Sequence, residues 1–218
     1  MTVRLAVFDC DGTLIDSQIA ICEAMETAFA QNHLAAPARN DIRRAVGLSL
    51  PQAVQRLIPE ADAALRANLV NDYKLAFRDA RAAGRLVQTP FDGMIDVLDR
   101  LRAAGWQLAV ATGMSDRGLI HCLAVNDISD RFVSLQTADR HPSKPHPAML
   151  EAALSDTGAQ PCDCVMIGDT AFDMEMGRSI GVRAIGVDWG YHEAAELIAA
   201  GAEFVAETPN DLAEYLIR

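Results

Sequence analysis

Two aspartates stand one residue apart where an apolar stretch of the sequence ends. Asp9 and Asp11 follow the stretch Val3–Phe8, and Gly12 comes directly after them. Because residues i and i+2 of an extended chain point to the same side, both carboxylates are expected to face one pocket. Taken alone, the pattern also fits a turn in which Asp11 and Gly12 simply end a strand. Other residues must decide between chemistry and a turn.

Three further groups of polar residues lie at or just after the ends of apolar stretches. Thr112 and Gly113 end one stretch, Lys144 lies in a proline-rich loop, and Asp169 and Asp173 stand where a strand gives way to a helix. Each group has a structural explanation of its own: a strand end, a solvated lysine, and an aspartate that caps a helix. Ligands of parallel sheets bind beyond the carboxyl ends of the strands, where all these residues are expected. Their common placement favours one shared site.

The elements that would position these residues alternate between strand and helix. Met94, Val97, Leu98 and Leu101 recur at helical spacing, for example. The five strand candidates are nearly continuously apolar, as strands buried on both faces should be; they are Val3–Phe8, Trp106–Ala111, Phe132–Leu135, Cys164–Ile167 and Val182–Val187. The alternation predicts an α/β fold, with a parallel sheet covered by helices on both faces.

Residues 17–87 interrupt this alternation. The segment contains no strand candidate, whereas Leu65, Leu69, Tyr73 and Phe77 follow a helical stripe. Asp16 and Ser17 are expected to cap the first of its helices. We therefore predict two units: a catalytic core made of residues 1–16 and 88–218, and a helical cap domain made of residues 17–87.

Composition limits the partners of the chain. Its 218 residues carry a formal net charge of −11, which argues against nucleic acid and anionic membranes, because both require a basic surface. No apolar run approaches the roughly 20 residues of a membrane span, and no signal peptide is recognised. The five cysteines form no disulfide pattern, so reduced thiols and a cytoplasmic location are expected. Monomer and homodimer remain open.

The four groups together resemble the signature motifs of the haloacid dehalogenase superfamily of phosphohydrolases. The matching residues are Asp9-x-Asp11-Gly12-Thr13-Leu14, Thr112-Gly113, Lys144-Pro145, and Gly168-Asp169 with Asp173. The resemblance covers nearly the whole chain and implies a Rossmann-like core with an inserted α-helical cap. Within the superfamily, the chain looks most like phosphoglycolate phosphatases, which act on a small phosphorylated metabolite.

The resemblance also implies a magnesium ion. A phosphate dianion that approaches Asp9 meets a like charge, at a cost of about 4 kcal/mol per unit pair at 4 Å and an effective dielectric of about 20. By similarity, the ligands of Mg²⁺ are the carboxylates of Asp9 and Asp169 and the backbone carbonyl of Asp11. Asp173 would orient a metal-bound water or contact Lys144.

The implied catalytic roles divide the motif residues. Asp9 attacks phosphorus and forms an aspartyl phosphate, while Asp11 protonates the leaving group and later accepts a proton from water. Lys144 neutralises the nucleophile, and Thr112, Lys144 and the Gly113 N–H bind the phosphoryl oxygens. An acidic residue at position 11 argues against the dehalogenase branch, because a halide needs no proton.

Two questions stay open at the level of the sequence. Arg43 and Arg44 lie in a short stretch similar to the cap of phosphoglycolate phosphatases and could hold a carboxylated substrate, but a solvated helix face explains them equally well. The alternatives to a phosphatase are a β-phosphoglucomutase-like mutase and a non-catalytic receiver-type domain that carries a phospho-aspartate. A receiver would lack the large insert after its first strand.

Overall fold

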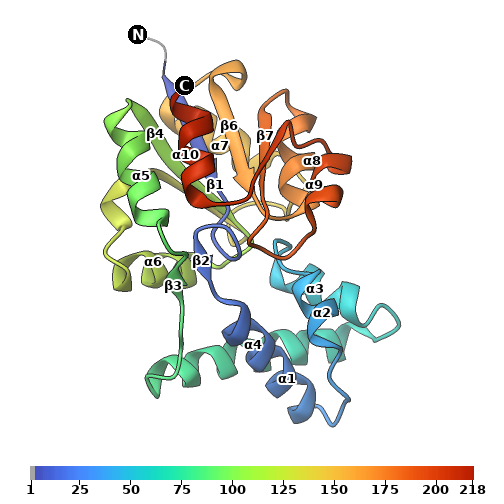
Figure 1. Cartoon of the computed structure of the whole chain (residues 1–218). Helices are drawn as coiled ribbons and strands as arrows, with labels where there is room; N and C mark the ends of the chain where they lie inside the picture. Colours follow the sequence, from blue (N-terminus) through green and yellow to red (C-terminus); the bar gives the residue numbers. More distant parts are fainter. Residues whose placement is uncertain (1–2) are drawn as a thin grey trace.

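The protein has an α/β fold built around a parallel sheet (Figure 1). The structure, a computed structural model, describes residues 3–218. Six strands pair in the order β5-β4-β1-β6-β7-β8, and every neighbouring pair is parallel. The strands are β1 (Arg4–Phe8), β4 (Trp106–Thr112), β5 (Phe132–Thr137), β6 (Cys164–Gly168), β7 (Arg183–Val187) and β8 (Phe204–Ala206). The predicted fold class is confirmed.

The strand order contains a reversal beside β1. The chain proceeds from β1 outward to β4 and β5, and then returns to the other side of β1 with β6. Phe8, the last residue of β1, pairs with Val110 of β4 and with Ile167 of β6. Open α/β sheets bind ligands at such a reversal, outside the carboxyl ends of the strands. Asp9 and Asp169 follow the two strands that flank this point.

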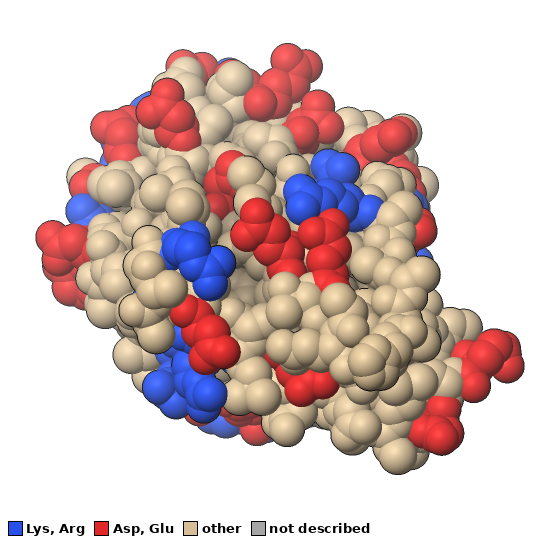
Figure 2. Space-filling model, turned by 90° about the horizontal axis from the view of Figure 1, so that it is seen from below, with Lys and Arg blue, Asp and Glu red and all other residues tan. Residues whose placement is uncertain are grey.

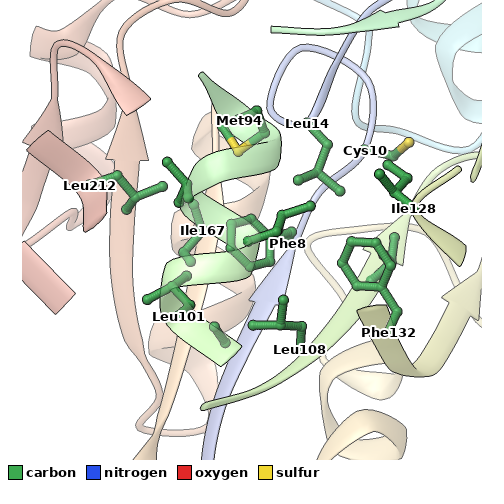
Figure 3. Packing of buried hydrophobic residues seen from close by; sticks show 14 of the residues in the cluster. Phe8, Cys10, Leu14, Met94, Leu101, Leu108, Ile128, Phe132, Ile167 and Leu212 are labelled. Carbon is green, nitrogen blue, oxygen red and sulfur yellow. The ribbon is translucent and has the colours of Figure 1, made fainter. Parts of the chain in front are cut away.

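Helices cover both faces of the sheet. One face packs against α5 (Met94–Ala103), α6 (Asp116–Val125) and α10 (Pro209–Ile217), and the other against α7 (Ala148–Thr157), α8 (Ala171–Ser179) and α9 (Ala194–Ala200). The spacing of the predicted stripe in α5 is confirmed, because Met94, Val97, Leu98 and Leu101 are all buried. In Figure 3, Leu101, Phe8 and Ile167 lie together between α5 and the sheet. This packing fixes the end of β1.

Residues between the first two long strands form a separate group of helices, below the sheet in Figure 1. They are α1 (Gln18–Gln31), α2 (Arg39–Arg43), α3 (Leu50–Leu57) and α4 (Ala63–Ala82), and they share a hydrophobic cluster of their own. Two short strands, β2 (Ile15–Asp16) and β3 (Thr89–Pro90), pair antiparallel where the chain leaves the sheet and returns to it. The division into two domains at residues 17 and 87 stays a prediction.

Two details differ from the sequence-based expectation. β8 is absent from the predicted strands, because it has only three residues, two of them half-buried, at the edge of the sheet. Ser17 precedes α1, but its hydroxyl makes no capping hydrogen bond and donates to Asp11 instead. All five cysteines are free, as expected. None of the described helices is long and apolar enough to span a membrane.

Candidate active site

Asp9 is buried directly after β1, and one of its carboxylate oxygens has no hydrogen-bond partner among the described residues. Its Oδ1 accepts a hydrogen bond from the Cys10 N–H at 2.6 Å and lies 2.9 Å from Lys144 Nζ. Within residues 3–218, its buried Oδ2 has no hydrogen-bond partner. Burial raises the pKa of Asp9 to about 7, although the charge of Lys144 acts in the opposite direction. A buried oxygen with free lone pairs is suited to bind a cation or to attack an electrophile.

Lys144 is completely buried between two carboxylates. Its Nζ lies 2.6 Å from Asp173 Oδ1 and 2.9 Å from Asp9 Oδ1. Burial alone would lower the pKa of Lys144, but the charges of Asp173 and Asp9 outweigh it and raise the pKa. The ammonium group is therefore charged. Of the two alternatives left open for Asp173, the structure shows the contact with Lys144, and its Oδ2 accepts hydrogen bonds from the N–H and hydroxyl of Thr170.

Asp169 follows β6 and faces the same point as Asp9. Its Oδ1 accepts a hydrogen bond from Thr13 Oγ1 at 2.7 Å, and its Oδ2 accepts one from the Tyr191 N–H at 2.9 Å. Burial, together with the charges of Asp9 and Asp173, raises its pKa well above the usual range. Gly12 has a positive φ of 85°, and a Cβ there would lie 2.3 Å from Asp169 Oδ2, so the approach of the two segments requires glycine.

The three buried carboxylates fit a divalent cation. Asp9, Asp169 and Asp173 each offer an oxygen, and these oxygens lie within 4.8 Å of one another. When all three are ionised, Lys144 balances one of their charges and two negative charges remain. Oxygen ligands and this excess charge are what Mg²⁺ prefers. Both oxygens of Asp169 and of Asp173 accept hydrogen bonds, whereas Asp9 keeps one oxygen without a partner among the described residues.

Asp11 is less buried than Asp9 and differs from it in its surroundings. It lines the same cavity as Asp9, as the i, i+2 spacing predicted. Its Oδ1 accepts a hydrogen bond from Ser17 Oγ at 2.6 Å, and the Tyr191 hydroxyl lies 3.4 Å from the same serine oxygen. Burial raises the pKa of Asp11, although Ser17 acts against this. A carboxyl group with a raised pKa that faces the cavity can carry a proton to a ligand.

Thr112 and Gly113 contribute a hydroxyl and polar backbone to the lining of this cavity. Thr112 ends β4 and its Oγ1 accepts a hydrogen bond from the Met114 N–H. A Cβ on Gly113 would lie 2.4 Å from the carbonyl oxygen of Leu48, which belongs to the loop between α2 and α3. Ser49 of that loop donates its N–H to Ser143 Oγ at 2.7 Å. The helical insert is thus seated directly on the end of the sheet.

Arg43 and Arg44 lie away from the cavity wall formed by the described residues. Arg44 makes a bidentate ion pair with Glu196 at the start of α9, and this pair lowers the pKa of Glu196 to about 2. Arg43 Nε donates to the backbone carbonyl of Arg39. The predicted role of both arginines in substrate specificity stays a prediction, without a contact that supports it.

Other residues of the site did not emerge from the sequence. Thr13 is part of the first motif, but its hydrogen bond to Asp169 joins residues 156 positions apart, and no local sequence pattern predicts such a contact. Ser17, an expected helix cap, donates its hydroxyl hydrogen bond to Asp11 instead. The cavity wall also includes Lys74, Arg78 and Arg81 of α4, whose spacing of four and three residues was visible in the sequence. His141 and His146 bond to Gln136 and Ala148 and take no part in the carboxylate cluster.

Comparisons with known proteins agree on one family. A family model described as haloacid dehalogenase-like hydrolase matches residues 6–187. A probable phosphatase named IndB, from Dickeya dadantii, is 34% identical over 211 residues, which cover 94% of this chain and 89% of the relative. A phosphoglycolate phosphatase from Caulobacter vibrioides is 32% identical over 190 residues, which cover 85% of this chain and 79% of the relative.

A solved structure supports the fold. The crystal structure of a predicted phosphoglycolate phosphatase from Haemophilus somnus superposes with a TM-score of 0.88 and covers 99% of both chains. At 19% sequence identity, this likeness concerns the fold alone.

Proposed function

Because the chain belongs to the haloacid dehalogenase-like hydrolases, we propose that it is a Mg²⁺-dependent phosphatase of a small phosphorylated metabolite. The membership confirms the resemblance that the four motifs indicated. Two relatives are named as phosphatases, one of them a phosphoglycolate phosphatase, which supports a phosphoric monoester as the substrate. The proposed reaction passes through a phosphoryl group bound covalently to Asp9.

One observation carries this proposal: Asp9 lines the cavity, and its buried Oδ2 has no hydrogen bond to the described residues. Its partner oxygen is held by the Cys10 N–H and Lys144, so the carboxylate cannot rotate freely. A fixed carboxylate oxygen can attack phosphorus in line and form an aspartyl phosphate. Thr112 and the Gly113 N–H, on the cavity wall, would bind the oxygens of the phosphoryl group.

The residues around Asp9 would hold the metal. We assign its ligands to the carboxylates of Asp9 and Asp169 and to the backbone carbonyl of Asp11. Bound Mg²⁺ supplies positive charge that offsets the repulsion between the carboxylates and a phosphate dianion. Lys144 adds a fixed positive charge on the other side of Asp9, and Asp173 holds Lys144 in place.

Asp11 would move the protons. Its raised pKa favours a proton on the carboxyl group when the substrate binds, and its place at the cavity lets it donate this proton to the departing alkoxide. The resulting carboxylate then accepts a proton from the water that attacks the aspartyl phosphate. Asp9 and Asp11 thus have different surroundings for different roles.

The two alternatives differ from a phosphatase in observable ways. A receiver-type domain has no large insert after its first strand, whereas α1–α4 occupy that place here, which favours the enzyme. A mutase of the β-phosphoglucomutase type would return the phosphoryl group to a sugar. It would require a hexose bisphosphate and would release no inorganic phosphate.

The test is a measurement of phosphate release from a panel of phosphorylated metabolites, in EDTA and with Mg²⁺ or Ca²⁺ restored. We expect activity to vanish on chelation and to return with Mg²⁺. Ca²⁺ should replace it poorly, because it is larger and its coordination is looser. Full activity in EDTA would overturn the metal assignment, and phosphate transfer to a sugar without release would favour the mutase.

A further inference from the structure

The cavity that contains Asp9 has a basic wall of its own. Lys74, Arg78 and Arg81 lie on α4 at positions i, i+4 and i+7, so they share one face of the helix. Arg117, in the first turn of α6, lines the same cavity from the side of the sheet. The basic residues therefore come from two elements, one in the helical insert and one beside the core.

These cations lack acidic partners, although acids are abundant. The chain has 30 Asp and Glu against 19 Lys and Arg, yet Lys74, Arg81 and Arg117 form no ion pair with residues 3–218. Arg78 approaches only its neighbour Asp79, at 3.6 Å and on an exposed surface. Like charges three and four residues apart on a helix destabilise it. The stability of α4 therefore does not explain this arrangement.

Arg81 and Arg117 are close enough to affect each other. Arg81 Nε is buried and has no hydrogen-bond partner in the described part of the chain. Burial and the charge of Arg117 lower the pKa of Arg81, and burial with the same two arginines lowers the pKa of His121. The acid in this wall, Asp139, accepts a hydrogen bond from the Asp116 N–H. Asp139 forms no ion pair with Arg81 or Arg117 among the described residues, so neither arginine has a direct acidic partner.

The rest of the cavity suits a ligand longer than the smallest phosphate esters. Its volume of about 520 Å³ is in the range of pockets that hold extended organic ligands. Apolar side chains also line this cavity; they include Ile21, Met25, Ile42, Val46 and Tyr73. Figure 2 views the protein from below: acidic groups are spread over this face, while Lys and Arg gather in a few places, some of them beside a hollow.

We propose that the substrate carries a second anionic group, separated from the ester phosphate by an apolar spacer, and that this group binds between Arg81 of α4 and Arg117 of α6. Lys74 and Arg78 extend the same positive surface along α4. The proposal rests on the phosphatase function, since it places the ester phosphate at Asp9. An anion held by both helices also connects the insert to the core while the substrate is bound.

The experiment compares matched substrates that differ in one charge. The substrates are ω-phosphooxy carboxylates of three to six carbons and their primary amides, and the quantity is the ratio of kcat/KM for acid and amide. Wild-type protein should prefer the acid, with the largest ratio at one chain length. Arg81→Gln and Arg117→Gln should each reduce that ratio about tenfold, the effect of losing one charge-assisted hydrogen bond.

Arg85→Gln is the matched control, because Arg85 follows the same helix, is exposed and lies outside the cavity wall. It removes the same charge and should leave the ratio unchanged. Equal kcat/KM for acid and amide in wild type, or ratios that fall equally in all three variants, would overturn the anion subsite. A third result would also overturn the proposal: wild-type protein shows no preference for the acid over the amide, but free propionate stimulates hydrolysis of the amide. The anion bound by the arginines would then be a separate ligand and not part of the substrate.

Hydrolysis of 4-nitrophenyl phosphate separates this outcome from a failure of the proposed function. The ester has no second anionic group, so wild-type protein that hydrolyses it with Mg²⁺ is a phosphatase whatever the subsite binds. If wild-type protein hydrolyses none of the esters, both the phosphatase and the subsite that depends on it are overturned.

Discussion

Ser17 Oγ donates a 2.6 Å hydrogen bond to Asp11 Oδ1, which ties the residue before helix α1 to the proposed general acid. Ser17 is buried and directly follows β2, the strand through which the chain leaves the sheet for the helical insert. The Tyr191 hydroxyl lies 3.4 Å from the same serine oxygen. The position of Asp11 therefore depends on the segment that connects the insert to the core.

Substitution Ser17→Ala should impair the proton transfer more than the binding of the phosphate. The hydrogen bond from Ser17 lowers the pKa of Asp11, so its loss raises that pKa further. If protonated Asp11 is the acid, the alkaline limb of the pH profile for alkyl phosphates should move to higher pH, and kcat should fall by roughly tenfold because the carboxyl group is no longer fixed.

Ser17→Thr keeps the hydroxyl and serves as the control. The alkaline limb of Ser17→Thr should lie where it does in the wild type. A purely structural role of Ser17 would instead lower kcat in Ser17→Ala without moving the alkaline limb. An unchanged pH profile in Ser17→Ala would show that the hydrogen bond does not set the protonation of Asp11.

Gly113→Ala should disturb the contact between the helical insert and the end of β4. The added Cβ would lie 2.4 Å from Leu48 O, and Gly113 itself has no positive φ, so the clash concerns the loop and not the strand end. Displacement of this loop by about 1 Å is expected to reduce kcat/KM by about ten- to a hundredfold. The free energy of unfolding should fall by about 1–3 kcal/mol, because the clash is with backbone atoms that must shift. Wild-type kinetics in this variant would contradict the contact between this loop and Gly113.

The metal-free protein should lose stability as the pH rises from 5 to 8. Burial raises the pKa of Asp9 from 3.8 to about 7 in the folded state, so the folded chain keeps a proton that the unfolded chain releases. The contribution of this group is complete below about pH 3.8 and is lost as the pH rises through 7. Urea titrations in EDTA should therefore show a decrease that is larger in wild type than in Asp9→Asn, by on the order of 2–3 kcal/mol.

The same experiment with Mg²⁺ supplies the control. Binding of the cation to ionised carboxylates should restore the stability of the wild type at pH 8 and have a smaller effect on Asp9→Asn. Identical pH dependence of both proteins in EDTA would mean that Asp9 is not the carboxylate whose pKa is raised.

The placement of the main site could be predicted because the carboxyl ends of parallel strands share one edge of a sheet. Strand prediction places Asp9 and Asp169 at the same edge of the sheet, and the strand order of the structure then makes their strands neighbours. The contacts between the insert and the core could not be predicted in this way. Arg44 forms an ion pair with Glu196, which lies 152 positions later, and no local sequence pattern predicts this pairing. The basic face of α4 was visible, but its orientation toward the cavity depends on tertiary packing.

The last prediction separates the two aspartates of the first motif. Asp9→Asn should form no phosphoenzyme and show essentially no turnover with any ester, because it removes the proposed nucleophile. Asp11→Asn should retain most of its Mg²⁺ affinity, since the proposed ligand at this position is the backbone carbonyl. It loses the proton for the leaving group, which is worth roughly 10²–10⁴-fold when the leaving group is an alkoxide.

An aryl phosphate makes the difference between these roles measurable. A phenol with a low pKa leaves without protonation, so the first step of Asp11→Asn should be slowed far less with an aryl ester than with an alkyl ester. Hydrolysis of the aspartyl phosphate still needs a base, so the intermediate should accumulate. Rapid-quench kinetics should show a burst of phenol followed by slow turnover, with phosphate bound to Asp9. If both esters lose the same factor in the first step and no burst is seen, Asp11 is not the group that transfers the proton, and its bond to Ser17 serves the structure alone.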